Sequence, residues 1–360
     1  MIEEQKHPIN KFISLITLLL CTAGIIFLIV TFIPSLSPSI VKFRRDNLLA
    51  AYAKPEKFRM PQPSSLPSHR LINYTDERLN DLINLLPSQT VTLTKFENCT
   101  LNVSTGAKIN SSIIQNSTMN ISGLNIHLEN VILINTKITI DNNSIAKISN
   151  SIIQDNQDRI HVSRSQLVIV ETLFINNNSK SLLYADGNAS LTVKNSEFRS
   201  NDGIIFSSHN QKYIDLDGNE SSLVPQFIIE HNLIEDNFHL PIYLADLDQF
   251  GTRITNNIFR GGALPYITIK DSDRPYVVIS QNYFEDQGVF IENSNHIILW
   301  ANKFNSIQDY AVQAINSNLI AFQYNIFSNI GDTAIFTKNT PQIELVHNTF
   351  GEVGERIVRK

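Results

Sequence analysis

Apolar residues alternate with polar ones through most of the chain after about position 89, in short stretches that end in polar turns. Late in the chain these stretches close with the tripeptide Asn-x-Phe, at 257–259, 282–284, 302–304, 325–327 and 348–350. The unit therefore repeats about every 20 to 25 residues. Alternation with a period of two, rich in β-branched residues and bounded by Asn, Ser and Gly, predicts strands rather than helices.

A single unit of two or three short strands cannot bury its own apolar face. Stacking successive units in parallel solves this, because the apolar positions then form one continuous interior. The expected inward positions of one strand are Ile267 and Ile269, and those of the next unit are Val289 and Ile291. The pattern therefore predicts a parallel solenoid.

The Asn-x-Phe turns, the apolar columns and the repeat length resemble the right-handed parallel β-helix proteins of the pectate-lyase-like superfamily. The resemblance implies an all-β, right-handed parallel β-helix over residues 88–360. It leaves the activity open, because polysaccharide lyases, uronan epimerases, glycoside hydrolases, phage tailspikes and noncatalytic surface proteins share these repeats. The Asp-Pro-His-Asp string of mannuronan epimerases is absent from this sequence.

The amino-terminal part has a different organisation. Residues 12–33 form an uncharged apolar run, and its length of about 22 residues suits a transmembrane helix better than the shorter core of a cleaved signal peptide. Residues 1–11 precede it as a short tail, and residues 34–72 follow it as a proline-rich linker. We therefore expect a single-pass membrane protein whose β-helix lies on the periplasmic or extracellular side.

Residues 73–87 carry the pattern of a short amphipathic helix. Thr75 is a suitable N-cap, acidic residues follow it, and Pro87 ends the apolar periodicity. Such a helix would cap the first coil and protect its open strand edge.

Composition narrows the range of partners. The chain has 360 residues, a formal net charge of −5 and only 18% charged residues, so it lacks the basic surface expected of a nucleic-acid binder. Its two cysteines, Cys21 and Cys99, cannot build a disulfide framework.

Outward positions of the stacked strands form two rows of candidate binding residues. We expect the first row to contain Tyr243, Thr268, Phe290, Gln313 and Phe336, and the second to contain Ala245, Lys270, Glu292, Ile315 and Lys338. Rings stack on sugar faces and cations pair with uronate carboxylates, so Tyr243, Phe290, Phe336 and Lys338 are candidate polysaccharide-binding residues. The alternative is an ordinary strand surface.

Two Asp-x-Asp pairs follow successive strands about one coil apart. In register, Asp246, Asp248, Asp271 and Asp273 would gather at one corner, where Ca²⁺ with its preference for oxygen ligands could relieve their repulsion. The alternative is turn chemistry, because aspartate at a strand end forms Asx-turns without any metal.

The resemblance implies carboxylates beside a basic residue that removes the proton next to a uronate carboxylate. On that basis Lys270 is the candidate base, with Asp271 and Arg274 beside it. The sequence thus predicts a membrane-anchored envelope protein that binds or modifies an acidic polysaccharide as a lyase or epimerase. The alternative is a noncatalytic scaffold or adhesion module with envelope protein partners.

Overall fold

The computed structural model describes residues 58, 60, 61, 73–187, 189–209, 227–247, 250–272 and 276–360. The chain divides into two units, Met1–Glu56 and Lys57–Lys360, and every described residue lies in the second. The predicted tail at 1–11, the predicted membrane span at 12–33 and most of the predicted linker at 34–72 lie outside the described residues. Within the described residues, no helix combines the length and the hydropathy that crossing a membrane requires.

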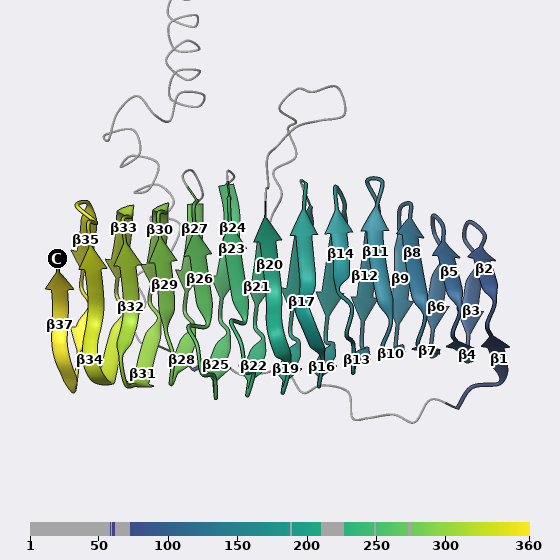
Figure 1. Ribbon diagram of the computed structural model, residues 1–360, viewed down its shortest axis with the longest axis horizontal. Helices are drawn as coiled ribbons and strands as arrows, with labels where there is room; N and C mark the ends of the chain where they lie inside the picture. The colour runs from purple at the N-terminus through teal and green to yellow at the C-terminus, as the bar shows by residue number, and fades with distance from the viewer. Residues whose placement is uncertain are drawn as a thin grey trace, which may run out of the picture. The chain divides into compact units, whose positions relative to one another are not determined.

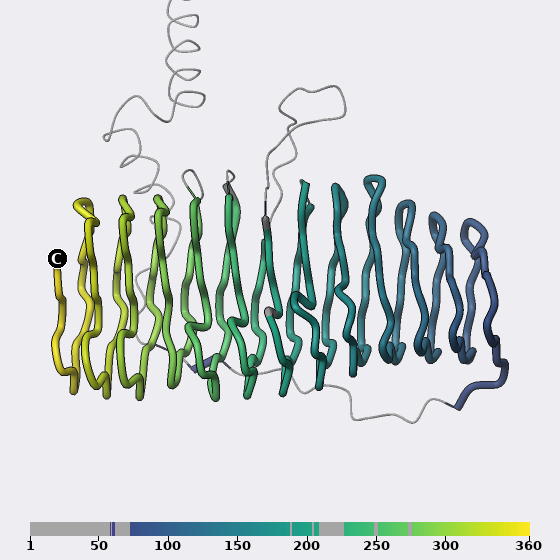
Figure 2. Tube along the Cα trace, in the orientation of Figure 1, coloured from purple at the N-terminus to yellow at the C-terminus, as the bar shows by residue number. Residues whose placement is uncertain are grey.

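The second unit is a parallel β-solenoid in which each coil contributes a strand to each of three columns (Figure 1). Each strand pairs in parallel with its counterpart one coil earlier and one coil later, as β26 does with β23 and β29. Successive coils stack side by side along the Cα trace (Figure 2). The predicted parallel β-helix is confirmed.

One column is a 12-stranded sheet and the other two belong to a 25-stranded sheet. We call these two the short column, which carries the Asn-x-Phe motifs, and the front column, which follows it in each coil. The 12-stranded sheet contains β3 (Thr90–Thr92), β6 (Lys108–Asn110), β9 (Ile126–Glu129), β12 (Ile145–Ser149), β15 (Gln166–Val170), β18 (Ser190–Lys194), β21 (Phe227–Glu230), β24 (Phe250–Thr255), β27 (Tyr276–Ser280), β30 (Asn295–Trp300), β33 (Asn318–Gln323) and β35 (Ile343–Val346). The short column contains β1 (Asp76–Leu79), β4 (Thr94–Glu97), β7 (Ile113–Gln115), β10 (Ile132–Ile134), β13 (Ile152–Gln154), β16 (Leu173–Ile175), β19 (Glu197–Arg199), β22 (Leu233–Glu235), β25 (Ile258–Arg260), β28 (Tyr283–Glu285), β31 (Lys303–Ile307), the start of β34 (Ile326–Lys338) and β36 (Thr349–Phe350). The front column contains β2 (Leu82–Leu85), β5 (Thr100–Val103), β8 (Thr118–Ser122), β11 (Lys137–Asp141), β14 (Ile160–Ser163), β17 (Asn178–Asp186), β20 (Asp202–His209), β23 (Ile242–Ala245), β26 (Ile267–Lys270), β29 (Val289–Glu292), β32 (Tyr310–Ile315), the end of β34 and β37 (Val353–Arg359).

The capping helix predicted at 73–87 is wrong. This segment forms β1 and β2, which pair with β4 and β5 and begin the solenoid. The apolar residues that suggested a helical face also alternate as a strand, so that Ile83 and Leu85 fall in register with the buried Leu101 and Val103. A short helix makes few backbone bonds and is marginal alone, whereas the open edge of the first coil offers a complete ladder.

Phenylalanine rings from successive short-column strands stack through the interior. Phe284 lies 4.9 Å from Phe259 and 4.7 Å from Phe304, with interplanar angles of 3° and 6°. Phe327 and Phe350 continue the stack. The Phe residues of the Asn-x-Phe motifs therefore form a continuous stack of rings along the core.

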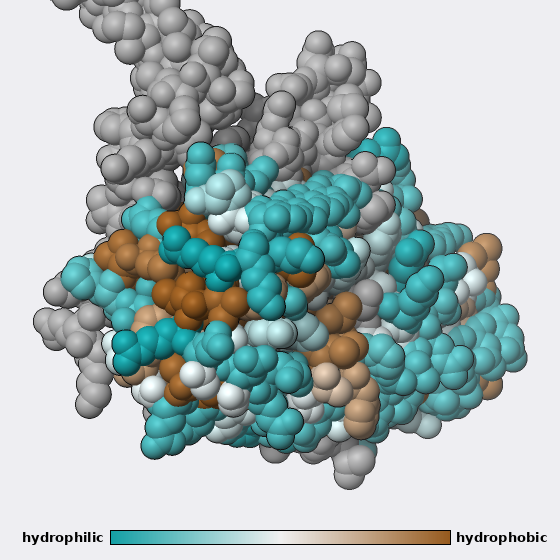
Figure 3. Space-filling model, turned by 60° about the vertical axis from the view of Figure 1, so that its left-hand side comes forward, coloured by the Kyte–Doolittle hydropathy of each residue, from teal (hydrophilic) through white to brown (hydrophobic). Residues whose placement is uncertain are grey.

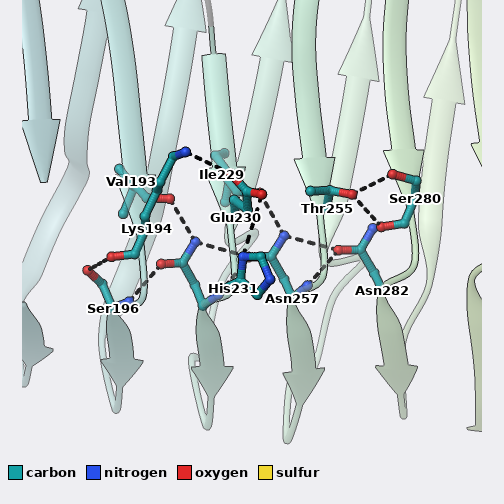
Figure 4. Close-up of polar contacts among 11 residues, drawn as sticks. Val193, Lys194, Ser196, Ile229, Glu230, His231, Thr255, Asn257, Ser280 and Asn282 are labelled. Carbon is teal, nitrogen blue, oxygen red and sulfur yellow. Dashed lines mark hydrogen bonds and ion pairs between the residues drawn. The ribbon is translucent and has the colours of Figure 1, made fainter. Parts of the chain in front are cut away.

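The motif's asparagine forms a second ladder at the corner between the 12-stranded sheet and the short column. The backbone N–H and the side-chain amide of Asn257 both donate to Oδ1 of Asn282, at 2.9 and 3.0 Å (Figure 4). Asn282 repeats this arrangement with Asn302. Asn257, Asn282, Asn302 and Asn325 are fully buried. Each one satisfies backbone groups that the sharp turn would otherwise leave unpaired in the interior.

The outer side of the short column carries an apolar patch in the middle coils. Leu233, Ile258 and Tyr283 occupy outward positions, yet they are buried, and Phe58 packs against them. Pro61, three residues further on, is also buried. Phe58, which precedes the first coil in the sequence, therefore lies against the side of the middle coils.

At the carboxyl-terminal end, the core is only partly covered in the described structure. Ile343, Leu345, Phe350, Val353 and Ile357 belong to the last coil and pack against the interior while staying partly exposed. Apolar side chains gather on this end in Figure 3, where it is turned toward the viewer.

Candidate functional site

Strand register aligns the residues of both rows predicted for the front column, while their role in binding stays a prediction. Strand register aligns Tyr243, Thr268, Phe290, Gln313 and Phe336 in one row, which we call the aromatic row. The same register aligns Ala245, Lys270, Glu292, Ile315 and Lys338 in the charged row. Tyr243, Phe290 and Gln313 are half-buried, Thr268 and Phe336 are buried, and Lys338 is exposed.

Lys270 lies at the centre of these rows and has two partners. Its Nζ lies 2.7 Å from Oε2 of Glu292 on the next coil and 5.4 Å from the centroid of the Phe290 ring. The hydrogen bond to Glu292 raises the pKa of Lys270, and partial burial opposes this shift. The contacts favour a cationic Lys270 that binds a carboxylate over the neutral amine that a base must supply.

Asp246 and Asp271 follow β23 and β26 and take the left-handed conformation, with φ of 51° and 50°. The next coils place Asn293, Asn316 and Asn339 in this conformation after their strands. The amide of Asn293 donates to Oδ1 of Asp271 at 2.8 Å. Asp and Asn tolerate this backbone better than other side chains with a Cβ, so the geometry fits the turn alternative.

The predicted calcium site stays a prediction. Asp248, Asp273 and Arg274 lie outside the described residues, and among the described ones no three His, Cys, Asp or Glu side chains group as a metal site would need. The donors that are described, Asp246 and Asp271, are carboxylates of the kind Ca²⁺ prefers. A complete coordination sphere would need oxygen atoms beyond these two residues.

Replacing Asp271 with asparagine separates the two interpretations. If Asp271 only shapes a turn, the free energy of unfolding should change by less than about 0.5 kcal/mol, because asparagine keeps the turn and extends the Asn row. The control Asp271→Val should cost about 1 to 3 kcal/mol, because a β-branched residue is strained at this φ. Both variants should be melted in Ca²⁺ and in chelator. A Ca²⁺-dependent rise of the wild-type midpoint that Asp271→Asn abolishes would instead support the four-carboxylate site.

The aromatic row continues toward the amino terminus into a cluster that the sequence reasoning missed. Register carries the row from Tyr243 through Ser207 and Tyr184 to His161, on β20, β17 and β14. Nε2 of His161 lies 2.9 Å from Oδ2 of Asp186. The His161 and Tyr184 rings are 5.4 Å apart, and the Arg159 guanidinium lies 4.5 Å from the centroid of the Tyr184 ring.

The surroundings of Tyr184 keep its phenol protonated. Partial burial raises the Tyr184 pKa, the negative charge of Asp186 adds to the rise, and Arg159 opposes it. Oδ1 of Asp186 is buried without a hydrogen-bond partner in the described part of the chain. The cluster thus holds a histidine, a phenol, a carboxylate and a cation within one outward surface.

A signal for this cluster was present in the sequence. In 159–163 and 183–186, apolar residues alternate with Arg159, His161, Tyr184 and Asp186, which is the pattern of the later strands. The regular unit of 20 to 25 residues holds in the later coils, whereas the ladder partners Asn201 and Asn237 are 36 residues apart. Because of this long interval, a constant spacing does not align the strands before it with the strands after it.

One family model and one solved structure support the fold. A family model described as "Right handed beta helix region" matches residues 214–356. A double mutant of the periplasmic alginate epimerase AlgG has a TM-score of 0.53 at 11% identity, over 77% of this chain and 84% of that chain. The AlgE4 A-module, a mannuronan C-5 epimerase of Azotobacter vinelandii, has a TM-score of 0.43 at 10% identity, over 74% and 88% of the two chains. The surface protein and adhesin PfbA of Streptococcus pneumoniae has a TM-score of 0.31 at 10% identity, over 79% and 91%. No curated protein sequence matches the chain.

Proposed function

Because the chain is a right-handed parallel β-helix protein with one long row of aromatic and polar side chains on its front column, we propose that it binds an acidic polysaccharide along that row. The bound polymer would be the substrate of a lyase-type or epimerase-type reaction. The continuity of the row is the observation that carries the proposal. Seven register steps separate His161 from Phe336. At about 4.8 Å per step the row is about 34 Å long, which suits several consecutive sugars.

The chemistry of the row fits a polymer with carboxylates. The half-buried rings of Tyr184, Tyr243 and Phe290 offer faces for sugar stacking. Lys270 and Lys338 in the charged row, and Arg159 beside Tyr184, supply cations for carboxylates. A neutral glycan would use the rings but would gain nothing from the charge of these cations.

Replacing Lys270 with alanine should weaken the binding of an acidic polymer about ten-fold, or about 1.4 kcal/mol, because the variant loses a cation and leaves Glu292 to repel the ligand. Binding of the full chain in detergent to polymannuronate, polyguluronate and polygalacturonate, measured by calorimetry at two salt concentrations, checks this. The matched control is Lys147→Ala, because Lys147 is exposed on the 12-stranded sheet. Equal losses in the two variants, or equal binding of a neutral glucan, would contradict the proposal.

The proposal includes the membrane tether. The apolar run at 12–33 would hold the β-helix at the outer side of a cell membrane, where envelope polysaccharides are found. Protease digestion of intact cells tests this, since an exposed β-helix should be cut and a cytoplasmic one protected.

The partly exposed core at the carboxyl-terminal end favours a second candidate function, a noncatalytic scaffold or adhesion module. A partly exposed apolar surface of this kind is typical of surfaces that contact other polypeptide segments. Absence of binding to every acidic polymer in the calorimetric panel would favour this candidate.

A further inference from the structure

The cluster around His161 brings two proton-transferring side chains to one face of the solenoid. His161 and Tyr184 occupy the same outward position on adjacent strands β14 and β17, and both are half-buried. Their ring centroids lie 5.4 Å apart, so one sugar residue lying on the row could contact both. The two groups therefore approach that sugar from the same side.

Asp186 determines how His161 can act. Its Oδ2 lies 2.9 Å from Nε2 of His161, and a carboxylate in that position favours the tautomer that carries its proton on Nε2. The lone pair is then on Nδ1, which is the atom that can take a proton from the substrate. Asp186 also stabilises the imidazolium that forms, so it is a positioning residue.

Tyr184 and Arg159 supply the complementary functions. The Tyr184 phenol stays protonated, because partial burial and Asp186 both raise its pKa, and it can therefore donate a proton. Arg159, 4.5 Å from the Tyr184 ring, brings a permanent cation to the place where a uronate carboxylate would accumulate charge.

We propose that His161, Tyr184, Asp186 and Arg159 form a β-elimination centre for a hexuronan linked through O4. This inference rests on the proposed function, since it needs an acidic polysaccharide on the row. Epimerisation requires a base and an acid on opposite sides of the sugar ring, whereas both groups here rise from one surface. Elimination with the C5 hydrogen and the C4 oxygen on the same side of the ring fits this arrangement.

The proposed step balances without any co-reactant. Nδ1 of His161 takes the C5 proton, and the electron pair of the broken C–H bond moves onto the carboxylate, where Arg159 stabilises the charge. That pair then forms the C4=C5 double bond while the C4–O4 bond breaks. Tyr184 gives its proton to the departing O4. Proton exchange with water returns His161 and Tyr184 to their starting forms.

The test uses the full chain in detergent with the three uronans named above, in D₂O and in H₂O. Wild-type protein should produce unsaturated chain ends from polymannuronate, in which the C5 hydrogen and O4 lie on the same side of the ring, and not from polyguluronate or polygalacturonate, in which they lie on opposite sides. The ends are seen by the ultraviolet absorbance of the new double bond and by mass spectrometry. His161→Gln and Tyr184→Phe should each lower kcat at least about 100-fold. Asp186→Asn should lower kcat about ten-fold with an unchanged KM, because it acts through His161. The matched control is His127→Gln, an exposed histidine on β9, which should leave the rate unchanged.

The outcomes separate this inference from the proposed function. Binding without unsaturated ends would overturn the elimination centre and leave polysaccharide binding in place. Deuterium incorporation at C5 without chain cleavage would overturn elimination in favour of epimerisation. If His161→Gln and Tyr184→Phe formed unsaturated ends as fast as the wild-type protein, residues other than His161 and Tyr184 would catalyse the elimination. Failure to bind any of the polymers would overturn both proposals.

Discussion

Replacing Phe284 with alanine is expected to lower the free energy of unfolding by about 3 to 5 kcal/mol. The Phe284 side chain is fully buried, and its ring stacks between Phe259 at 4.9 Å and Phe304 at 4.7 Å. The neighbouring rings are each held by their own coil, so the vacated space cannot close fully. The cost of a cavity therefore adds to the lost transfer free energy of the ring.

Urea unfolding followed by circular dichroism measures this effect, provided that the midpoint and the slope are both fitted. The matched control is Phe238→Ala, because the Phe238 side chain is 63% exposed and should change stability by less than about 0.5 kcal/mol. Similar losses for the two variants would mean that the ring stack does not dominate the core.

The sequence predicted the later coils well because each Asn-x-Phe motif meets two separate physical demands. The Phe must fill the interior, and the Asn must satisfy buried backbone groups at a sharp corner. A motif that serves both demands recurs once per coil and fixes the register between coils. That register also placed Lys270 beside Glu292, as the structure confirms.

The first coils were harder to predict because they lack this motif. The corner positions of the early coils hold Thr94 and Ser112, residue types that are common everywhere in the chain. There the Ser112 hydroxyl accepts a hydrogen bond from the Thr94 backbone N–H of the preceding coil. The early repeat is also shorter, since Asn102 contacts its counterpart Asn84 across 18 residues. Without the Asn-x-Phe motif and the later repeat length, the helical periodicity at 73–87 was the stronger signal, and it predicted a helix instead of strands.

The site was predicted only in part, for a geometric reason. Rows on one face follow from register alone, so Tyr243, Phe290 and Lys338 could be placed from the sequence. The contact of His161 with Asp186 is diagonal and joins residues 25 positions apart on adjacent coils. Such a pair can be predicted from the sequence only when the length of each intervening turn is known.

Asn282→Ala is expected to cost about 2 to 6 kcal/mol of unfolding free energy, because it leaves two buried donors without acceptors at about 1 to 3 kcal/mol each. These donors are the backbone N–H and the side-chain amide of Asn257, both of which bond to Oδ1 of Asn282. Asn282→Asp keeps the acceptor but removes the donor to Oδ1 of Asn302 at 3.0 Å, and so places two acceptors in contact. It should therefore also destabilise, in a pH-dependent way that alanine does not share. The control is Asn120→Ala. Asn120 is exposed and bonds to Asn102 on the outer surface, so this substitution should change stability by less than about 0.5 kcal/mol.

Urea unfolding of the three variants gives the comparison. If Asn282→Ala cost no more than Asn120→Ala, the interior ladder would be dispensable, and the recurrence of asparagine at this corner would need a cause other than the pairing of buried backbone groups.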